Sequence, residues 1–224
     1  MSVPTVDDVR AGLDRVRDRI EAAGGDAEKV RIVAVTKGFD AGVVSVALAA
    51  GVTDVGENYA QELVAKWPSV RTTGASPRLH FVGRLQRNKV RSLAGLVDVW
   101  QTVDRSSVGA EIARRAPGAT VLVQVNVGDE PQKGGCRLDD VDDLVAELSG
   151  LDLDVVGLMA IAEQADLATV RDQFDQVRRA ADRLALPERS MGMTADLEAA
   201  VGAGATMVRV GTALFGPRPG GAIA

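Results

Sequence analysis

Apolar positions along this chain follow two different spacings. In residues 6–23 they recur every three or four positions among charged residues, which is the period of one helical face. Residues 31–36 and 120–127 are instead short apolar runs rich in valine, which is typical of strands buried in a parallel sheet. The pattern therefore predicts an amphipathic helix first and buried strands after it.

Strand-like and helix-like segments then alternate along the rest of the chain. The predicted strands are residues 31–36, 53–58, 79–83, 96–102, 120–127, 153–159, 189–192 and 206–210. The helices predicted between and after them are residues 41–50, 59–67, 86–93, 106–116, 138–148, 167–184 and 195–203, with Pro68 expected to end the second. About eight repeats with short connections predict an α/β protein, a single (β/α)8 TIM barrel with an extra N-terminal helix. We expect residues 1–224 to form one domain, and a doubly wound open sheet is the alternative.

Composition narrows the classes of partner and compartment. A net charge of -5 and an isoelectric point near 5.0 disfavour nucleic acid as a partner, because phosphate backbones are bound by basic surfaces. No apolar run is long enough to span a bilayer, and the first residues lack a secretory signal, so we expect a cytoplasmic protein without a membrane partner. Cys136 and His80 are the only cysteine and histidine, which argues against an internal disulfide or a zinc site built from several such ligands. No metal site is expected.

Lys37 is the first candidate for chemistry, because it directly follows a buried strand. An ammonium at the end of an apolar strand loses hydration, so its pKa falls and part of it becomes a free amine that can form a Schiff base with an aldehyde. From this segment alone, a lysine that extends into solvent is an equally good interpretation. Other polar residues also follow predicted strands, where barrel enzymes place their sites: Asn58, Arg84, Asp104, Asn126, Ser190 and Arg209.

Two glycine-containing loops follow the last two predicted strands. Residues 190–194 read Ser-Met-Gly-Met-Thr, and residues 209–212 read Arg-Val-Gly-Thr. In barrels these positions commonly bind phosphate, since glycines let backbone N–H groups approach it and hydroxyls complete its shell. Each loop alone also fits an ordinary turn or a helix cap. Both loops and Lys37 are expected at one rim, which predicts a site for a phosphorylated aldehyde.

Several sequence blocks, in order from about Arg31 to Gly216, resemble one known family. The blocks are residues 33–37 (VAVTK), 56–62 (GENYAQE), 80–89 (HFVGRLQRNK), 157–159 (GLM), 190–194 (SMGMT) and 208–216 (VRVGTALFG). They look like the pyridoxal phosphate homeostasis proteins, whose barrel is similar to the alanine racemase N-terminal domain. The resemblance implies the cofactor pyridoxal 5'-phosphate (PLP), a TIM barrel and a role in PLP homeostasis.

The resemblance also implies roles for individual residues. Lys37 would hold PLP as a Schiff base, and Arg209 matches the arginine that faces the pyridine nitrogen in related racemases. Asn58 would lie near the other edge of the ring, and Met159 would form a wall beside it. The residues that would bind the phosphate are Ser190, Gly192, Thr194, Gly211 and Thr212.

Three functions remain open from the sequence. The first is a PLP carrier that buffers or delivers the cofactor without committed catalysis, with PLP-requiring apo-enzymes as recipients and a monomeric state. The second is a PLP-dependent amino-acid racemase or decarboxylase. Related racemases take a second acid/base group from a separate β-domain, and we expect none here because the chain ends soon after Gly216. The third is a cofactor-free Schiff-base aldolase, against which the sequence blocks argue.

Other conspicuous residues are expected to be structural. We interpret His80 as a hydrogen-bonded strand residue and Cys136 as an ordinary loop residue. Residues 139–143 are an acidic helix start rather than a metal site. Arg84, Arg87, Lys89 and Arg91 are expected on a solvated helix face, with Lys89 as a second PLP site being the less favoured alternative.

Overall fold

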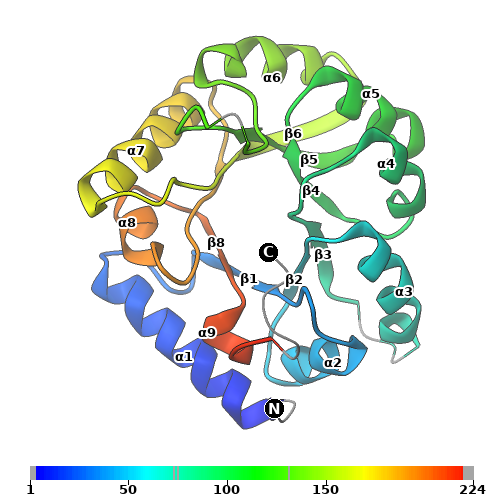
Figure 1. Cartoon of the computed structure of the whole chain (residues 1–224), viewed down its shortest axis with the longest axis vertical. Coiled ribbons are helices and arrows are strands. Elements are labelled where there is room, and N and C mark those ends of the chain that lie inside the picture. Colours follow the sequence, from blue (N-terminus) through cyan, green and yellow to red (C-terminus); the bar gives the residue numbers. More distant parts are fainter. Residues whose placement is uncertain (1–3, 73, 75, 131, 219–224) are drawn as a thin grey trace.

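The chain folds into a closed barrel of parallel strands in a computed structural model that describes residues 4–72, 74, 76–130 and 132–218 (Figure 1). The strands are β1 Arg31–Val35, β2 Asp54–Glu57, β3 Arg78–Phe81, β4 Val99–Val103, β5 Ala119–Val125, β6 Leu153–Ala160, β7 Glu188–Ser190 and β8 Met207–Val210. Neighbouring strands follow chain order and β8 pairs with β1, so no sheet edge stays open. This confirms the predicted (β/α)8 barrel and rules out the open sheet.

Helices surround the barrel on its outside (Figure 1). They are α1 Val6–Ala22, α2 Ala41–Ala49, α3 Ala60–Arg71, α4 Arg87–Leu93, α5 Ser106–Arg115, the 3-10 turn η1 Leu138–Asp140, α6 Val141–Ser149, α7 Leu167–Arg183, α8 Leu197–Gly202 and α9 Thr212–Phe215. A bilayer could not be crossed by any helix in the described residues, since none combines the necessary length and apolarity.

The extra N-terminal helix predicted from the periodicity is α1. It begins with a capping box, in which the Thr5 hydroxyl accepts a hydrogen bond from the Asp8 backbone and the Asp8 carboxylate accepts one from the Thr5 backbone. Its apolar stripe, Val9, Leu13, Val16 and Ile20, is buried. The helix packs against α8 and α9, the two helices that follow the strands carrying the predicted phosphate loops.

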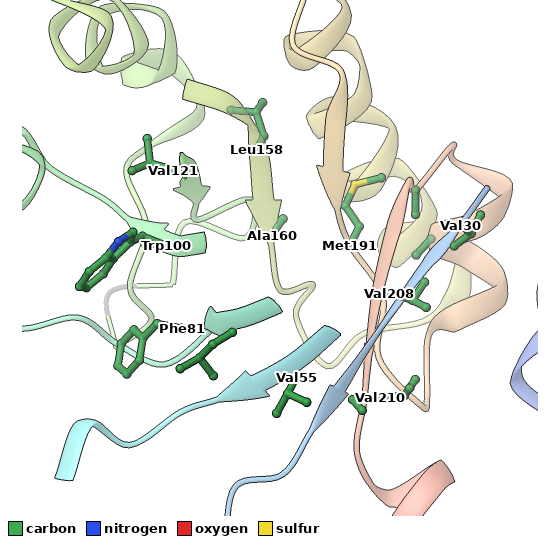
Figure 2. Close-up of a cluster of buried hydrophobic side chains, with 14 of the residues drawn as sticks. Val30, Val55, Phe81, Trp100, Val121, Leu158, Ala160, Met191, Val208 and Val210 are labelled. Atoms are coloured by element: carbon green, nitrogen blue, oxygen red, sulfur yellow. The ribbon is translucent and has the colours of Figure 1, made fainter. Parts of the chain in front are cut away.

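The hydrophobic core has an outer and an inner part because strand residues alternate between the two faces. Outward-facing side chains, including Phe81, Trp100 and Leu158, pack under the helices as the large core cluster (Figure 2). Val99 and Leu122 belong with Met159 to a separate inner cluster. The barrel interior is thus a filled core with polar residues at some positions.

Pro68 does not end α3, contrary to the sequence prediction. A proline inside a helix loses one backbone hydrogen bond and usually disrupts the helix, yet α3 continues for another turn to Arg71. Trp67 and Val70 lie on the buried face of that turn, 3% and 1% exposed. Burial of these two side chains offsets the cost of the proline, which local propensity alone could not indicate.

Candidate functional site

The loops after the strands enclose a cavity of about 280 Å³ at the carboxyl-terminal rim of the barrel. Six of the nine predicted site residues line it: Lys37, Asn58, Thr194, Arg209, Gly211 and Thr212. These residues come from the ends of β1, β2, β7 and β8, which the closed barrel brings to one mouth. The structure therefore brings together the lysine, the arginine and the two glycine-containing loops that the sequence singled out.

Lys37 lies in the loop after β1 and is half-buried. Burial lowers the pKa of its ammonium, the nearby cations Arg218 and Arg209 lower it further, and the Glu57 carboxylate opposes the shift. A lowered pKa means that a larger share of Lys37 is the neutral amine near neutral pH. That form is the nucleophile that a Schiff base requires.

A buried ion cluster holds the backbone on both sides of Lys37. Lys66 on α3 donates hydrogen bonds to the Thr36 carbonyl at 3.0 Å, to Glu57 Oε1 at 2.6 Å and to Glu62 Oε1 at 2.9 Å. The Gly38 N–H donates to the same Glu62 oxygen at 2.7 Å. The residues before and after Lys37 are therefore fixed by one cluster, which limits the positions that the Lys37 side chain can reach.

Arg209 on β8 presents a buried cation to the cavity. Its guanidinium donates to the Ser190 carbonyl at 2.7 Å, to Ser190 Oγ at 2.8 Å and to the Ala160 carbonyl at 2.9 Å. Burial lowers the pKa of Arg209 to about 10, so the group stays protonated at neutral pH. Within the described residues it forms no ion pair with a carboxylate, so its charge is available to an anionic ligand.

The loop after β7 is supported by the extra N-terminal helix. Arg19 on α1 donates to the Thr194 carbonyl at 2.9 Å and pairs with Glu198 at 2.6 Å. Within the part of the chain that the structure describes, the backbone N–H groups of Thr194, Ala195 and Gly211 donate no hydrogen bond to a protein atom. Unpaired N–H groups at the lining of a cationic cavity are suited to binding an anion such as a phosphate.

Three predicted site residues lie outside the cavity lining. Ser190 and Met159 are paired in register on β7 and β6, and both are fully buried in the barrel interior. The single hydroxyl proton of Ser190 goes to Gln101 at 2.7 Å, so it is not available to a phosphate. Gly192 has a φ of +91° and its Cα faces Ala200 on α8, where a Cβ would come within 2.6 Å of the Ala200 Cβ. These three residues support the site rather than form its surface.

Arg218 lines the cavity although the sequence blocks ended at Gly216. The rings of Phe39 and Phe215 pack with centroids 5.7 Å apart, which holds α9 beside the loop after β1. This contact brings the Arg218 side chain over Gly38, where a Cβ would lie 2.9 Å from Arg218 Cδ. A cation shortly after the last block was the only sequence signal for Arg218. The other residues that the sequence analysis missed are Val35, Phe39, Val82, Ile161, Met193, Ala195 and Gly216.

The structural interpretation of His80 and Cys136 is supported. His80 is fully buried and hydrogen-bonded through both ring nitrogens, to Asp54 at 2.8 Å and to Gln101 at 2.7 Å. Burial raises the pKa of the Cys136 thiol to about 12, so it is protonated at neutral pH and unsuited to act as a base. The acidic residues 139–143 lie at η1 and the start of α6, and no group of three or more possible metal ligands occurs in the described residues.

Comparison with known proteins identifies the family. Residues 12–219 match the family model described as alanine racemase, N-terminal domain. A pyridoxal phosphate homeostasis protein of Pseudomonas aeruginosa is 39% identical over 216 residues, which cover 93% of each chain. A protein of the same name from Deinococcus radiodurans is 40% identical over 222 residues, covering 96% of this chain and 100% of the relative.

A solved structure agrees with both the fold and the family. PipY of Synechococcus elongatus, solved with PLP bound, matches with a TM-score of 0.77 at 30% identity, and the match covers 90% of this chain and 100% of PipY. The family model, the two relatives and the PipY structure agree on the family. The chain belongs to the pyridoxal phosphate homeostasis protein family, built on the alanine racemase N-terminal domain fold.

Proposed function

We propose that this chain binds PLP in the rim cavity, holds it as a Schiff base on Lys37, and buffers or delivers it without committed catalysis. PLP combines an aldehyde with a phosphate, and the cavity offers a matching amine and a set of anion-binding groups. The family assignment and the PLP-bound structure of PipY support the same ligand. The proposal includes PLP-requiring apo-enzymes as recipients and a monomeric, single-domain, cytoplasmic protein.

The charges of the cavity fit an anionic cofactor. Among the described residues that line it, the ionisable side chains are Lys37, Arg209 and Arg218, and none is a carboxylate. We assign the phosphate to Thr194, Gly211 and Thr212, whose loops supply hydroxyls and N–H groups that have no partner among the described residues. Lys37 supplies the nucleophilic amine, and the cluster around Lys66 keeps its backbone in place.

Arg209 favours storage of the cofactor over catalysis. When bound, PLP supplies an aldehyde carbon and a ring that withdraws electrons most strongly when its nitrogen is protonated. We assign Arg209 to the side of the ring nitrogen, following the resemblance to the racemases. A protonated guanidinium at that position disfavours a proton on the nitrogen, because two like charges would lie close together. The ring is then a weaker electron sink.

The residues that line the rim cavity distinguish between a carrier and an enzyme. A racemase needs a second group that can move a proton on the face of the substrate opposite the lysine. The described residues around the cavity include no histidine, tyrosine, cysteine or carboxylate. Tyr59, the only tyrosine, does not line this cavity. The lining therefore favours a carrier.

Exchange of amino-acid α-protons with solvent tests this choice. The PLP-loaded protein is incubated in heavy water with each L-amino acid in turn, and deuterium at the α-carbon is followed by NMR. We expect exchange no faster than with free PLP at the same concentration, because the cavity has no second proton-transfer group. Rapid exchange that saturates with one amino acid, and that disappears in Lys37→Ala, would show an enzyme instead of a carrier.

A further inference from the structure

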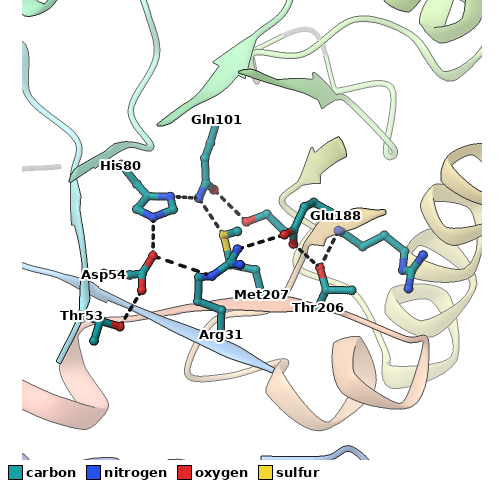
Figure 3. Close-up of polar contacts among 10 residues, drawn as sticks. Arg31, Thr53, Asp54, His80, Gln101, Glu188, Thr206 and Met207 are labelled. Carbon is teal, nitrogen blue, oxygen red and sulfur yellow. Dashed lines mark hydrogen bonds and ion pairs between the residues drawn. The ribbon is translucent and has the colours of Figure 1, made fainter. Parts of the chain in front are cut away.

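A continuous chain of hydrogen bonds crosses the barrel interior and ends at Arg209. Arg209 donates to Ser190 Oγ at 2.8 Å, and Ser190 donates to Gln101 Oε1 at 2.7 Å. The Gln101 amide nitrogen reaches His80 Nδ1 at 2.7 Å, and His80 Nε2 reaches Asp54 Oδ1 at 2.8 Å. All five residues are at least 94% buried. Figure 3 shows the central part of this hydrogen-bond chain, with dashed lines from Gln101 to His80 and to Met207.

The direction of every donor in this chain is fixed by the two ends. The Arg209 guanidinium can only donate, so the single proton of Ser190 is left for the Gln101 carbonyl oxygen. The Gln101 amide then donates to His80 Nδ1, which must be unprotonated. His80 therefore carries its proton on Nε2 and donates it to Asp54.

Met207 supports this orientation of the Gln101 amide. The second N–H of Gln101 points to the Met207 sulfur, with the nitrogen 2.9 Å from it. If the amide were rotated by half a turn, its oxygen would face that sulfur and the unprotonated ring nitrogen. The Gln101 oxygen, the Met207 sulfur and His80 Nδ1 would then all be acceptors, so neither contact would contain a hydrogen atom to share. Gln101 thus uses its oxygen and both of its amide hydrogens in the observed orientation.

The far end of the chain carries a negative charge. Burial opposes ionisation of Asp54, but hydrogen bonds from His80 and Thr53 and the charge of Arg31 hold the pKa of its carboxyl below the usual value. Thr53 donates to Asp54 at 2.7 Å, and Arg31 lies 3.8 Å away (Figure 3). Burial lowers the pKa of His80, so the imidazole between the two ends stays neutral. The dipoles of the neutral links are therefore aligned between a cation and an anion, the arrangement in which they stabilise both.

We propose that Gln101 is a positioning residue for the cofactor site, which orients the Arg209 guanidinium through Ser190 although it does not line the cavity itself. Gln101 joins the two halves of this hydrogen-bond chain, His80 with Asp54 and Ser190 with Arg209. It contacts β3 through His80, β7 through Ser190 and β8 through Met207. Without it, Ser190 loses its acceptor and its hydroxyl rotates freely. Arg209 then keeps its carbonyl contacts but loses a fixed hydroxyl partner. The effect on the cofactor rests on the proposed PLP function, while the effect on Arg209 does not.

His80 provides a direct readout in the unmodified protein, because it is the only histidine and its imidazole signals need no assignment. Nitrogen-15 NMR of the ligand-free protein should show a neutral ring with the proton on Nε2. A ring protonated on Nδ1 would reverse the direction of the chain and overturn the proposal. This experiment needs no substitution and no PLP.

Gln101→Leu tests the positioning role, with Gln124→Leu as its matched control. Gln124 is a buried glutamine on β5 that donates to the Gly134 carbonyl, and no hydrogen bond joins it to Arg209 in the described residues. In Gln101→Leu, hydrogen exchange of the Arg209 guanidinium should be about tenfold faster, the equivalent of one hydrogen bond, and should be unchanged in the control. Equal exchange rates in Gln101→Leu and wild type would overturn the proposal.

Titration with PLP extends the test to the cofactor. The Gln101→Leu protein should bind PLP about tenfold more weakly, and loading of the wild type with PLP should shift the His80 signals through the chain. If Gln101→Leu bound PLP as tightly as the wild type while its Arg209 guanidinium exchanged faster, Gln101 would orient Arg209 only in the free protein. The proposed effect of Gln101 on PLP binding would then be overturned. Failure of the wild type to bind PLP would instead refute the proposed function, and the exchange measurement would still decide the role of Gln101.

Discussion

Lys37→Ala is expected to abolish the visible absorption band that PLP acquires on binding, while the protein stays folded. Within the described residues the Lys37 amine makes no hydrogen bond or ion pair, so its removal leaves no buried partner exposed. The covalent contribution to binding disappears, but Arg209, Arg218 and the phosphate loops remain. PLP should therefore still bind, with its affinity lower by at least about tenfold. Absorption spectra and an equilibrium titration measure both effects.

Lys37→Arg and Lys89→Ala are the matched controls for this result. Arginine keeps the positive charge but is not a nucleophile, so Lys37→Arg should also lack the band. Lys89 is a half-buried lysine on α4 that does not line the cavity, so Lys89→Ala should keep it. A persistent band in Lys37→Ala, or its loss only in Lys89→Ala, would place the Schiff base on another lysine.

Lys66→Met is expected to cause the largest loss of stability. Lys66 and Glu57 are 7% and 0% exposed, so methionine in place of the lysine leaves a carboxylate buried without a cation. Breaking a buried pair in this way costs about 3–5 kcal/mol of unfolding free energy. After the substitution, the Thr36 hydroxyl still donates to Glu57 Oε1 at 2.6 Å, but Glu57 Oε2 has no hydrogen-bond partner within the described residues, so one neutral donor is left in place of the cation. Urea unfolding of the variant and the wild type gives the difference.

The loss of stability in Lys66→Met should depend on pH in a defined direction. Burial already raises the pKa of Glu57, with Lys66 as the main opposing influence, so the variant raises it further. Between the unfolded pKa of about 4.3 and the raised folded value, the native variant binds more protons than the unfolded chain. The difference in unfolding free energy between wild type and Lys66→Met should therefore shrink as the pH falls from about 8 toward 5.

Lys29→Met is the control for this measurement. Lys29 forms an exposed pair with Asp26 at 2.8 Å, with its side chain 84% exposed, so its replacement should leave the unfolding free energy close to that of the wild type at any pH. A loss of stability in Lys66→Met as small as that in Lys29→Met, or one independent of pH, would contradict the role assigned to the buried cluster.

The fold and much of the site could be predicted from the sequence because their signals are local. The valine-rich runs predicted the strands, and a closed parallel barrel necessarily gathers their carboxyl ends, which is how Lys37, Arg209 and Gly211 were predicted to share one rim. The two structural interpretations of His80 and Cys136 also needed only general expectations about buried strands and loops.

The remaining features depend on contacts between distant parts of the chain. Ser190 and Met159 occupy strand ends like the lining residues, and only the register of the barrel shows that they lie in its interior. Gln101 meets Ser190 across 89 positions of sequence, and nothing near either residue indicates the contact. Arg218 reaches Lys37 because an aromatic contact places α9 beside the first loop. Such pairings become visible only in the folded chain.

The identity of the lysine that carries PLP tests the account most directly. The chain has five lysines, Lys29, Lys37, Lys66, Lys89 and Lys133. Borohydride reduces a Schiff base to a stable amine, so treatment of the PLP-loaded wild type followed by peptide mass spectrometry locates the adduct. We predict a single pyridoxyl phosphate on the peptide that contains Lys37. An adduct mainly on any of the other four lysines, or no adduct in a protein that binds PLP, would contradict the account.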